Sequence, residues 1–347
     1  MRTAAWSLAV WVSFASGVSA AELRGAGASA PDALLQEWAR EYGKAKGAKV
    51  LYEATGSGEG IRRIKAGEVA FAASDVALSV PELQGSTLVQ FPVALGGIVP
   101  VVNIPGVAKG SLRLTGALLA DVMRGRIQNW NAPEVAKANP NLSLPDLPIK
   151  RGHRGDKSGS TAVMTSYLSR VSADWKSSIG SGLQVAWPAG SQACEGSDGV
   201  VEFLAKTPGA ISYVDFSRVK SRDLSGVQLE NRAKKFVAPS KAGFQAAAIA
   251  FPWAQAPAFS VVLVDQPGAE SWPVTSAVFV LMRLNAEPEI SRDVLRFFEW
   301  ALEGGAAAAE RLSFIPLPAP VAQTVRAGWS RQFKEKDGKP LAVASLY

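Results

Sequence analysis

Short apolar runs alternate with helical patterns along the chain, and this alternation limits the fold more than any other feature of the sequence. Strands that alternate with helices form α/β folds. The apolar runs predict strands over 49–54, 69–74, 98–104, 210–214 and 276–284. The helical patterns predict helices over 118–124, 160–171, 200–206, 291–302 and 321–333, and an earlier one with Leu34, Leu35, Trp38 and Tyr42 on a single face.

The chain has 347 residues, which is enough for two domains. The sequence contains no internal repeat and no low-complexity linker. Two domains without a linker are joined by strands that pass between them, and the long apolar runs at 98–104 and 276–284 are the candidates. We therefore predict a discontinuous first lobe of residues 21–98 and 275–347, and a second lobe of residues 99–274.

Residues 1–20 have the pattern of a secretory signal peptide. Arg2 gives the positive start, and the apolar stretch at 4–12 is too short to span a bilayer stably. Val18-Ser19-Ala20 ends the segment with the small residues that signal peptidase recognises. We predict a cut after Ala20 and a periplasmic mature protein. The alternative is a cytosolic protein with an apolar N-terminus.

The chain contains one cysteine, Cys194, and one histidine, His153. An internal disulfide and a zinc site built from Cys and His are therefore excluded, and a Ser-His-Asp triad would have to use His153. We expect neither metal nor cofactor, a strand position beside the site for His153, and a free thiol at Cys194. The net charge of +7 favours anionic partners.

Three segments share one design, in which a strand is followed by a turn of small residues with a hydroxyl group and then by a helix start. They are Gly25–Pro31, Thr55–Gly60 and Arg154–Thr161. A helix N-terminus offers unpaired N–H groups and the positive end of the helix dipole, and glycines let the backbone approach a ligand. The design predicts an anion site. The alternative is that Ser57 and Ser158 are ordinary N-caps.

Three other sequence patterns match known functional motifs only in part. Residues 25–30 match G-x-G-x-x-A, with Glu53 as a ribose-binding acid, but the preceding strand is too short for a dinucleotide fold. Asp156 takes the place of the glycine that a phosphate-binding P-loop needs before Lys157. Residues 217–220 match S-x-x-K without the companion K-T-G motif, so we expect a solvated helix face there.

Asp75 follows the predicted strand 69–74, at the end of a strand where α/β sheets present residues to a ligand. Its alternative role is a cap for the next turn. A carboxylate repels a fully deprotonated anion, but it accepts a hydrogen bond from an anion that retains a proton. Phosphate retains a proton at neutral pH and sulfate does not. One acceptor among many donors therefore predicts discrimination in favour of phosphate.

Several motifs follow one another in a recognisable order. They are Gly25-Ala-Gly-Ala-Ser29, Ala72-Ala-Ser-Asp75, Gln90-Phe-Pro-Val, Val102-Asn-Ile-Pro-Gly106, Thr165-Ser-Tyr-Leu168, Pro208-Gly-Ala-Ile-Ser-Tyr213, Trp272-Pro-Val-Thr275 and Asp337-Gly-Lys-Pro-Leu341. In these motifs, over nearly the whole chain after residue 20, the sequence resembles the periplasmic phosphate-binding proteins of bacterial high-affinity phosphate ABC importers.

The resemblance implies a set of phosphate-binding residues and one supporting residue. The phosphate-binding residues are Ser29, Ala30, Ser57, Asp75, Arg154, Ser158, Gly159 and Ser160. Asp156 matches the acid that pairs with the arginine and orients it. Three positions depart from the family pattern. Ala30 replaces an aromatic residue but keeps its backbone N–H, while Glu59 and Lys157 replace glycines. We expect Glu59 to point outward and Lys157 partly to offset its charge.

The resemblance also implies a two-lobed α/β fold of the type II-like periplasmic-binding-protein class. Its sheets are mixed, helices cover both faces, and crossover strands form the hinge. The implied partners are inorganic phosphate and the transmembrane permease subunits of an ABC transporter with a cytoplasmic ATPase. We expect a monomer that binds no nucleic acid and is not an enzyme. The alternatives are a binding protein for arsenate, sulfate or molybdate, and a periplasmic phosphate-ester hydrolase.

Overall fold

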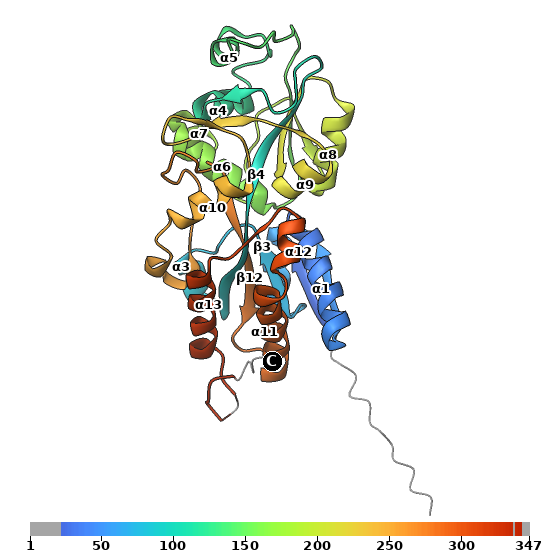
Figure 1. Ribbon diagram of the computed structural model, residues 1–347, viewed down its shortest axis with the longest axis vertical. Coiled ribbons are helices and arrows are strands. Elements are labelled where there is room, and N and C mark those ends of the chain that lie inside the picture. Colours follow the sequence, from blue (N-terminus) through green and yellow to red (C-terminus); the bar gives the residue numbers. More distant parts are fainter. Residues whose placement is uncertain (1–21, 336, 342–347) are drawn as a thin grey trace, which may run out of the picture.

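The computed structural model describes residues 22–335 and 337–341, so the predicted signal peptide lies outside the described residues. Figure 1 shows two lobes along the long axis, with strand β4 (Leu88–Asn103) running from one to the other. Lobe 1 is built around β1–β3 and β12, and lobe 2 is built around β6–β8. None of the helices in the described part of the chain has the length and apolar character needed to cross a membrane.

The sheet of lobe 1 has the strand order β2-β1-β3-β12-β4, and β13 also pairs with β4. Its strands besides β4 are β1 (Leu23–Gly27), β2 (Val50–Ala54), β3 (Phe71–Ser74), β12 (Thr275–Arg283) and β13 (Ile315–Pro316). Strands β1, β2 and β3 are mutually parallel, whereas β12 runs antiparallel to both of its neighbours. The sheet is therefore mixed, as expected.

Strand β4 is ten residues longer at its start than the predicted strand at 98–104. Its first part, Leu88–Gly97, pairs with β12, and its last part, Ile98–Asn103, pairs with the lobe 2 strand β8. All but the last of its residues are buried, because both faces are covered. Polar and small residues such as Gln90 and Gly96 interrupt the apolar pattern of the first part, and sequence periodicity therefore missed it.

The expectation of two crossing strands is only half right. Strand β12 pairs with β3 and with the lobe 1 part of β4, and its first residue, Thr275, lies opposite Gly97. The second connection between the lobes passes just before β12. There the Ile98 N–H donates to the Val274 carbonyl at 2.9 Å, and Trp272 Nε1 donates to the Ile98 carbonyl at 3.0 Å.

The sheet continues into lobe 2 through β4, with the strand order β4-β8-β6-β7, and β9 also pairs with β4. These strands are β6 (Lys150–Arg154), β7 (Ser191–Cys194), β8 (Ala210–Asp215) and β9 (Ser225–Gly226). A separate three-stranded sheet contains β5 (Arg113–Leu114), β10 (Gln228–Glu230) and β11 (Phe236–Val237). Strands β6, β7 and β8 are parallel, so the helices that follow β6 and β7 begin at one edge of the sheet.

The predicted helices are all present, with ends within four residues of the predicted positions, and the structure adds several short helices that were not predicted. In lobe 1 they are α1 (Asp32–Lys46), α2 (Ser57–Ala66), α3 (Val80–Gln84), α11 (Pro288–Glu303), α12 (Ala306–Arg311) and α13 (Ala319–Gln332). In lobe 2 they are α4 (Gly116–Arg124), α5 (Pro133–Ala138), α6 (Gly159–Val171), α7 (Ala173–Ser178), α8 (Gly196–Lys206), α9 (Phe216–Ser221) and α10 (Lys241–Ile249), followed by two short 3-10 turns at Trp253–Gln255 and Pro257–Phe259.

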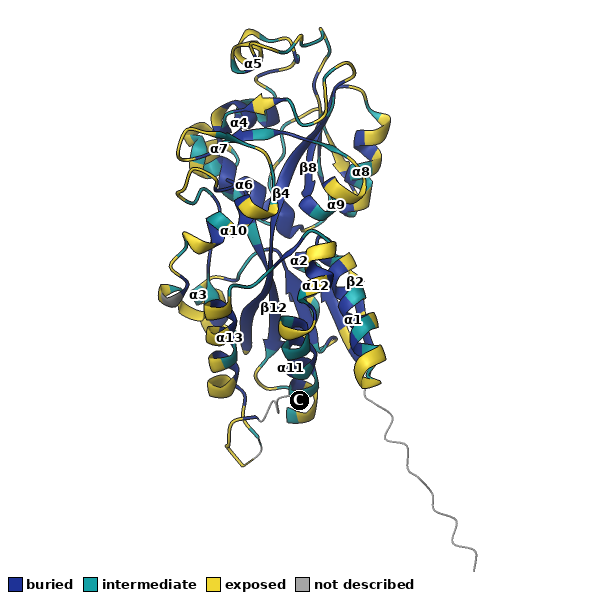
Figure 2. Cartoon of the chain, viewed as in Figure 1, coloured by how far each residue is buried: buried dark blue, intermediate teal, exposed yellow. Residues whose placement is uncertain are grey.

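Helices cover both faces of the lobe 1 sheet, as predicted (Figure 2). Phe71 and Ala73 of β3 pack into a core that includes residues of α1, α11, α12 and α13. Ala72, between them, points to the opposite face and packs with residues of α2 and α3. This division follows from the two-residue period of a strand.

We predict that the passage of β4 between the lobes depends on a glycine at position 97. A Cβ atom there would lie 2.2 Å from the ring of Phe244, which is fully buried against Phe216 and Trp272. Gly97→Ala should therefore lower the free energy of unfolding by about 1–3 kcal/mol, as overpacking does. The matched control is Gly96→Ala, whose Cβ would make an ordinary contact at 3.5 Å with Phe314. Equal urea midpoints for the two variants would contradict this prediction.

Candidate functional site

Four turns that each join a strand to a helix meet where the two lobes face each other. Lobe 1 contributes the turns from β1 to α1 and from β2 to α2, and lobe 2 contributes those from β6 to α6 and from β7 to α8. Parallel strands present their carboxyl ends at the same edge of a sheet, and each of these ends is followed by a helix N-terminus. The local sequence design thus places several N-terminal helix ends around one region.

Asp75 lies at the centre of the contact between the lobes. Its carboxylate Oδ2 accepts a hydrogen bond from Ser160 Oγ of α6 at 2.9 Å, and its own N–H donates to Ser57 Oγ at 3.4 Å. A Cβ atom on Gly159 would lie 2.4 Å from Ser57 Oγ and 2.9 Å from the Cβ of Asp75. Glycine at this position therefore lets the start of α6 approach the turns of lobe 1.

Arg154 is held in place by a carboxylate and a hydroxyl group. Its Nε and Nη2 donate to the two oxygens of Asp156 at 2.6 and 2.5 Å, and its side chain is only 2% exposed. Its Nη1 donates to Ser197 Oγ at 3.1 Å, and that oxygen lies 2.9 Å from Ser29 Oγ of lobe 1. The predicted pairing of Asp156 with Arg154 is therefore present, and a chain of polar contacts joins the arginine to the first turn.

The structure brings all the predicted site residues into this region, and their local roles differ. Ser158 is an N-cap, because its Oγ accepts the Thr161 N–H at 3.3 Å. Ser57 is not an N-cap, since the cap position of α2 is Gly56. Ala30 is buried and lines a small cavity together with Asp75. For Ser158 the ordinary capping role thus coexists with its place beside the site.

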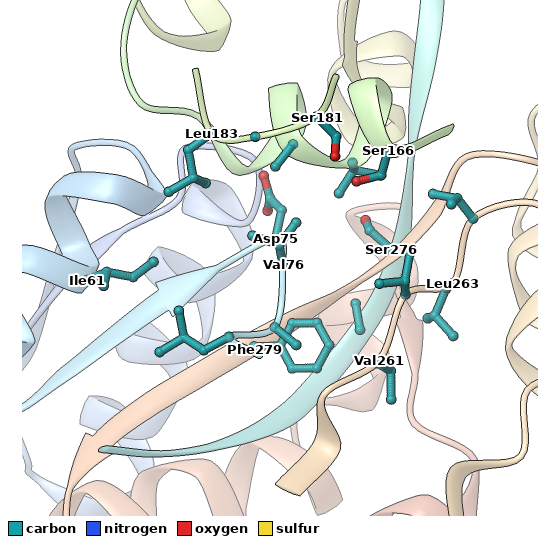
Figure 3. Close-up of a pocket in the computed structure, with 18 of the residues that line it drawn as sticks. Ile61, Asp75, Val76, Ser166, Ser181, Leu183, Val261, Leu263, Ser276 and Phe279 are labelled. Carbon is teal, nitrogen blue, oxygen red and sulfur yellow. The ribbon is translucent and has the colours of Figure 1, made fainter. Parts of the chain in front are cut away.

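Asp75 also lines a second and larger cavity, of about 720 Å³ (Figure 3). Asp75 and Lys157 lie on its wall together with apolar side chains such as Val76, Leu263 and Phe279. The pKa of Asp75 is raised to about 6, chiefly because the side chain is buried. The hydrogen bond from Ser160 and the charges of Arg154 and Arg218 act in the opposite direction, and the charge of nearby Asp215 adds to the rise. A carboxyl group with this pKa is mostly ionised at neutral pH, so it can accept hydrogen bonds there.

Two charged departures from the family pattern have separate roles. Glu59 forms ion pairs with Arg62 and Arg63 of its own helix, and the hydrogen bonds from these arginines lower its pKa to about 2. Glu59 therefore points outward as predicted, and these arginines offset its charge. Lys157 contributes a backbone contact between the lobes, because its carbonyl accepts the Gly58 N–H at 2.9 Å.

His153 and Cys194 occupy neighbouring strands behind the site. His153, in β6, stacks on Trp187 with a centroid distance of 4.9 Å, and its Nδ1 lies 2.7 Å from Ser191 Oγ. Burial lowers the pKa of His153. Cys194 is a buried free thiol. Within the described parts of the chain, no group of His, Cys, Asp and Glu side chains could hold a metal ion.

Sequence reasoning missed two residues that the structure places at the site. Ser197 follows Gly196 at the start of α8, which is a fourth turn of the same design, but the helix pattern was evident only from residue 200. Arg218 lies in the segment for which a solvated helix face was expected. That expectation is right for Lys220, which is exposed, and wrong for Arg218, whose side chain is 13% exposed and pairs with Asp215. No local signal distinguishes these two basic residues.

Two lobes, crossing chain segments and a polar site between them define the class of solute-binding proteins of the periplasmic type. A family model described as the PBP superfamily domain matches residues 13–302. The phosphate-binding protein PstS of Pasteurella multocida is 42% identical over 94% of this chain and 95% of its own length. PstS of Haemophilus influenzae is 41% identical over 90% of this chain and 94% of its own length. The chain belongs to the PBP superfamily and, within it, to the family of the phosphate-binding proteins PstS.

Solved structures of similar proteins share the fold. The periplasmic phosphate-binding protein PfluDING, solved with bound phosphate, is 22% identical with a TM-score of 0.71, and the match covers 93% of this chain and 96% of that one. A phosphate ABC transporter substrate-binding protein from Clostridium perfringens, also solved with phosphate, is 18% identical with a TM-score of 0.64. That match covers 86% of this chain and 100% of the other. These likenesses support the two-lobed α/β fold.

We predict that the phosphate-free protein becomes more stable at pH 8 when Asp75 is replaced by asparagine. Because the pKa of Asp75 is raised to about 6, the folded protein binds a proton more tightly than the unfolded chain, and its stability falls as pH rises from about 4 to 6. Asp75→Asn should gain about 1–3 kcal/mol in the free energy of unfolding at pH 8 and almost nothing at pH 4.

Urea unfolding at the two pH values measures this difference. Glu270→Gln, at an exposed position, is the control and should change stability equally at both. A gain for Asp75→Asn that is the same at pH 4 and pH 8 would show that the buried charge is not its cause.

Proposed function

We propose that this protein binds inorganic phosphate between its two lobes and delivers it to the permease of an ABC importer. The proposal rests chiefly on Asp75, a buried carboxylate that accepts a hydrogen bond from the Ser160 hydroxyl group and lies beside the turns of both lobes. Phosphate with one remaining proton can donate to this carboxylate while its other oxygens accept from hydroxyl groups and N–H groups. Sulfate has no proton to donate, so binding it would leave two acceptors facing each other.

The phosphate-binding residues in this proposal are Ser29, Ala30, Ser57, Asp75, Arg154, Ser158, Gly159 and Ser160, with Asp156 as the support of Arg154. The guanidinium of Arg154 offers a planar fork of donors that suits two phosphate oxygens. Asp156 holds the fork in one orientation, so little side-chain entropy remains to be lost when an anion binds. The helix N-termini of α2 and α6 add partial positive charge.

Closure follows from the division of these residues between the lobes. Phosphate would bridge residues 21–98 and 275–347 on one side and residues 99–274 on the other, and so stabilise the closed form. We propose that this closed form docks on the transmembrane permease, which works with a cytoplasmic ATPase. The protein would act as a monomer in the periplasm after a signal peptide is cut behind Ala20.

Hydrolysis of phosphate esters is the alternative from a different class. The sequence shows no serine with an evident base, but the structure places Ser191 Oγ 2.7 Å from Nδ1 of His153. The His153 ring stacks on Trp187, and its pKa is lowered by burial. Binding without chemistry is favoured, because the turns of both lobes and the Arg154 guanidinium converge near Asp75 and Ser29, and not at Ser191. Turnover of a chromogenic phosphate ester that Ser191→Ala abolishes would support hydrolysis instead.

We predict that isothermal titration of the phosphate-free mature protein finds one saturable phosphate site and no response to sulfate. Asp75→Asn should reduce the ratio of phosphate to sulfate affinity, because the asparagine amide offers a donor to a deprotonated anion. An unchanged ratio would remove Asp75 from the selection of the anion. Binding of sulfate alone by the parent would overturn the specificity proposed here, and arsenate, which also retains a proton, serves as the third titrant.

We predict that Arg154→Ala weakens phosphate binding by about 1.5–3 kcal/mol or more, which is the range for a hydrogen bond to a charged group. The same titration measures this loss. Arg170→Ala, at an exposed position in the last turn of α6, removes an arginine outside the site and is the control. If the two variants bind phosphate equally well, Arg154 does not contact the anion.

A further inference from the structure

Arg218 lies beside the predicted phosphate site in lobe 2, where it pairs with the buried Asp215 and the exposed Asp198. Its Nη1 lies 2.9 Å from Asp215 Oδ2, and its Nε lies 3.1 Å from Asp198 Oδ1. The Asp215 side chain is 4% exposed, and its other oxygen caps α9 by accepting the Arg218 N–H at 3.0 Å. Two carboxylates, one at the end of β8 and one in α8, therefore fix the plane of the guanidinium.

The same guanidinium also reaches lobe 1. Its Nη1 donates to the backbone carbonyl of Ser29 at 2.9 Å. The Ser29 hydroxyl in turn lies 2.9 Å from Ser197 Oγ of α8. Ser29 is thus held by lobe 2 at both its carbonyl and its hydroxyl. A hydrogen bond from a charged donor that is largely shielded from water is stronger than an exposed one.

Electrostatics gives Arg218 a second effect on the site. Asp75 and Asp215 are both buried, and the charge of Asp215 raises the pKa of Asp75, whereas the charge of Arg218 lowers it. An incoming anion would meet two buried carboxylates in this region. Arg218 offsets one of them directly through its ion pair with Asp215. Arg218 therefore reduces the negative charge that an incoming anion meets near Asp75.

We propose that Arg218 is an inter-lobe latch, a positioning residue that holds Ser29 in place and slows the release of the bound anion from the closed protein. The proposal rests on the proposed function, since the latch acts on closure around an anion. It assigns to Arg218 no contact with phosphate. Opening the lobes must break the bond between Nη1 and the Ser29 carbonyl, so the latch acts on the dissociation rate more than on the association rate.

The test compares phosphate release from the parent and from variants by stopped-flow mixing with a fluorescent phosphate sensor. Arg218→Met keeps an apolar stem of similar length and removes every donor. Arg218→Met alone leaves the charge of Asp215 buried without its partner, so the double variant Asp215→Asn/Arg218→Met is measured beside it. Asparagine at position 215 can still cap α9. Arg222→Met, at an exposed position one turn further along, is the matched control.

We expect both latch variants to release phosphate about tenfold faster or more, with an association rate within about threefold of the parent. The ratio of phosphate to sulfate affinity should stay unchanged, because Asp75 is intact. Arg218→Lys keeps the charge but not the fork that reaches three oxygens, so its release rate should lie between those of the parent and Arg218→Met.

Release from the folded double variant at the rate of the Arg222→Met control would overturn the latch. A purely structural role would lower the unfolding temperature of Arg218→Met and leave the release rate of the double variant unchanged. If the parent binds another oxyanion instead of phosphate, the proposed function fails, and the release rate of that oxyanion tests the latch in the same way. A parent that binds no oxyanion would contradict both proposals.

Discussion

The cost of burying the charge of Asp75 between two lobes is the constraint on which the rest of the site depends. An ionised carboxylate out of contact with water is stable only when donors or positive charge surround it. Ser160 supplies one donor from lobe 2, and the guanidinium groups of Arg154 and Arg218 lower its pKa through their charge. The result is a carboxyl that stays mostly ionised near neutral pH although it is buried. The lobes must approach closely to achieve this, which explains the glycine at position 159.

The parts of the fold that depend on local sequence could be predicted, and those that depend on distant contacts could not. Helices such as α1 and α11 have clear apolar faces, and the turns at Ser29, Ser57 and Ser158 combine glycine with hydroxyl residues next to a helix start. The first part of β4 has no regular pattern, because burial on both faces removes the alternation that identifies a strand. Its length became evident only from its partners, β12 and β8.

The same distinction applies to the site. Asp75, Arg154 and Asp156 were predicted from strand ends, residue chemistry and a family resemblance, and the structure brings them together with the three turns. Ser197 and Arg218 were missed for different reasons. The first lies in a turn whose helix begins with small and polar residues, and the second differs from the exposed Lys220 only in its surroundings. Partners 168 and 189 residues away in the chain leave no trace in a short stretch of sequence.

The position of β12 in the sheet of lobe 1 has a consequence for how this protein reaches its folded state. That strand lies between β3 and β4, yet it follows all of lobe 2 in the sequence. The central strand of the lobe 1 sheet therefore cannot be in place until about four fifths of the chain is available, whatever the order in which other parts form. Contacts of such long sequence separation slow folding. A chain whose central strand is available only late stays unfolded for longer, which would suit the export to the periplasm proposed above.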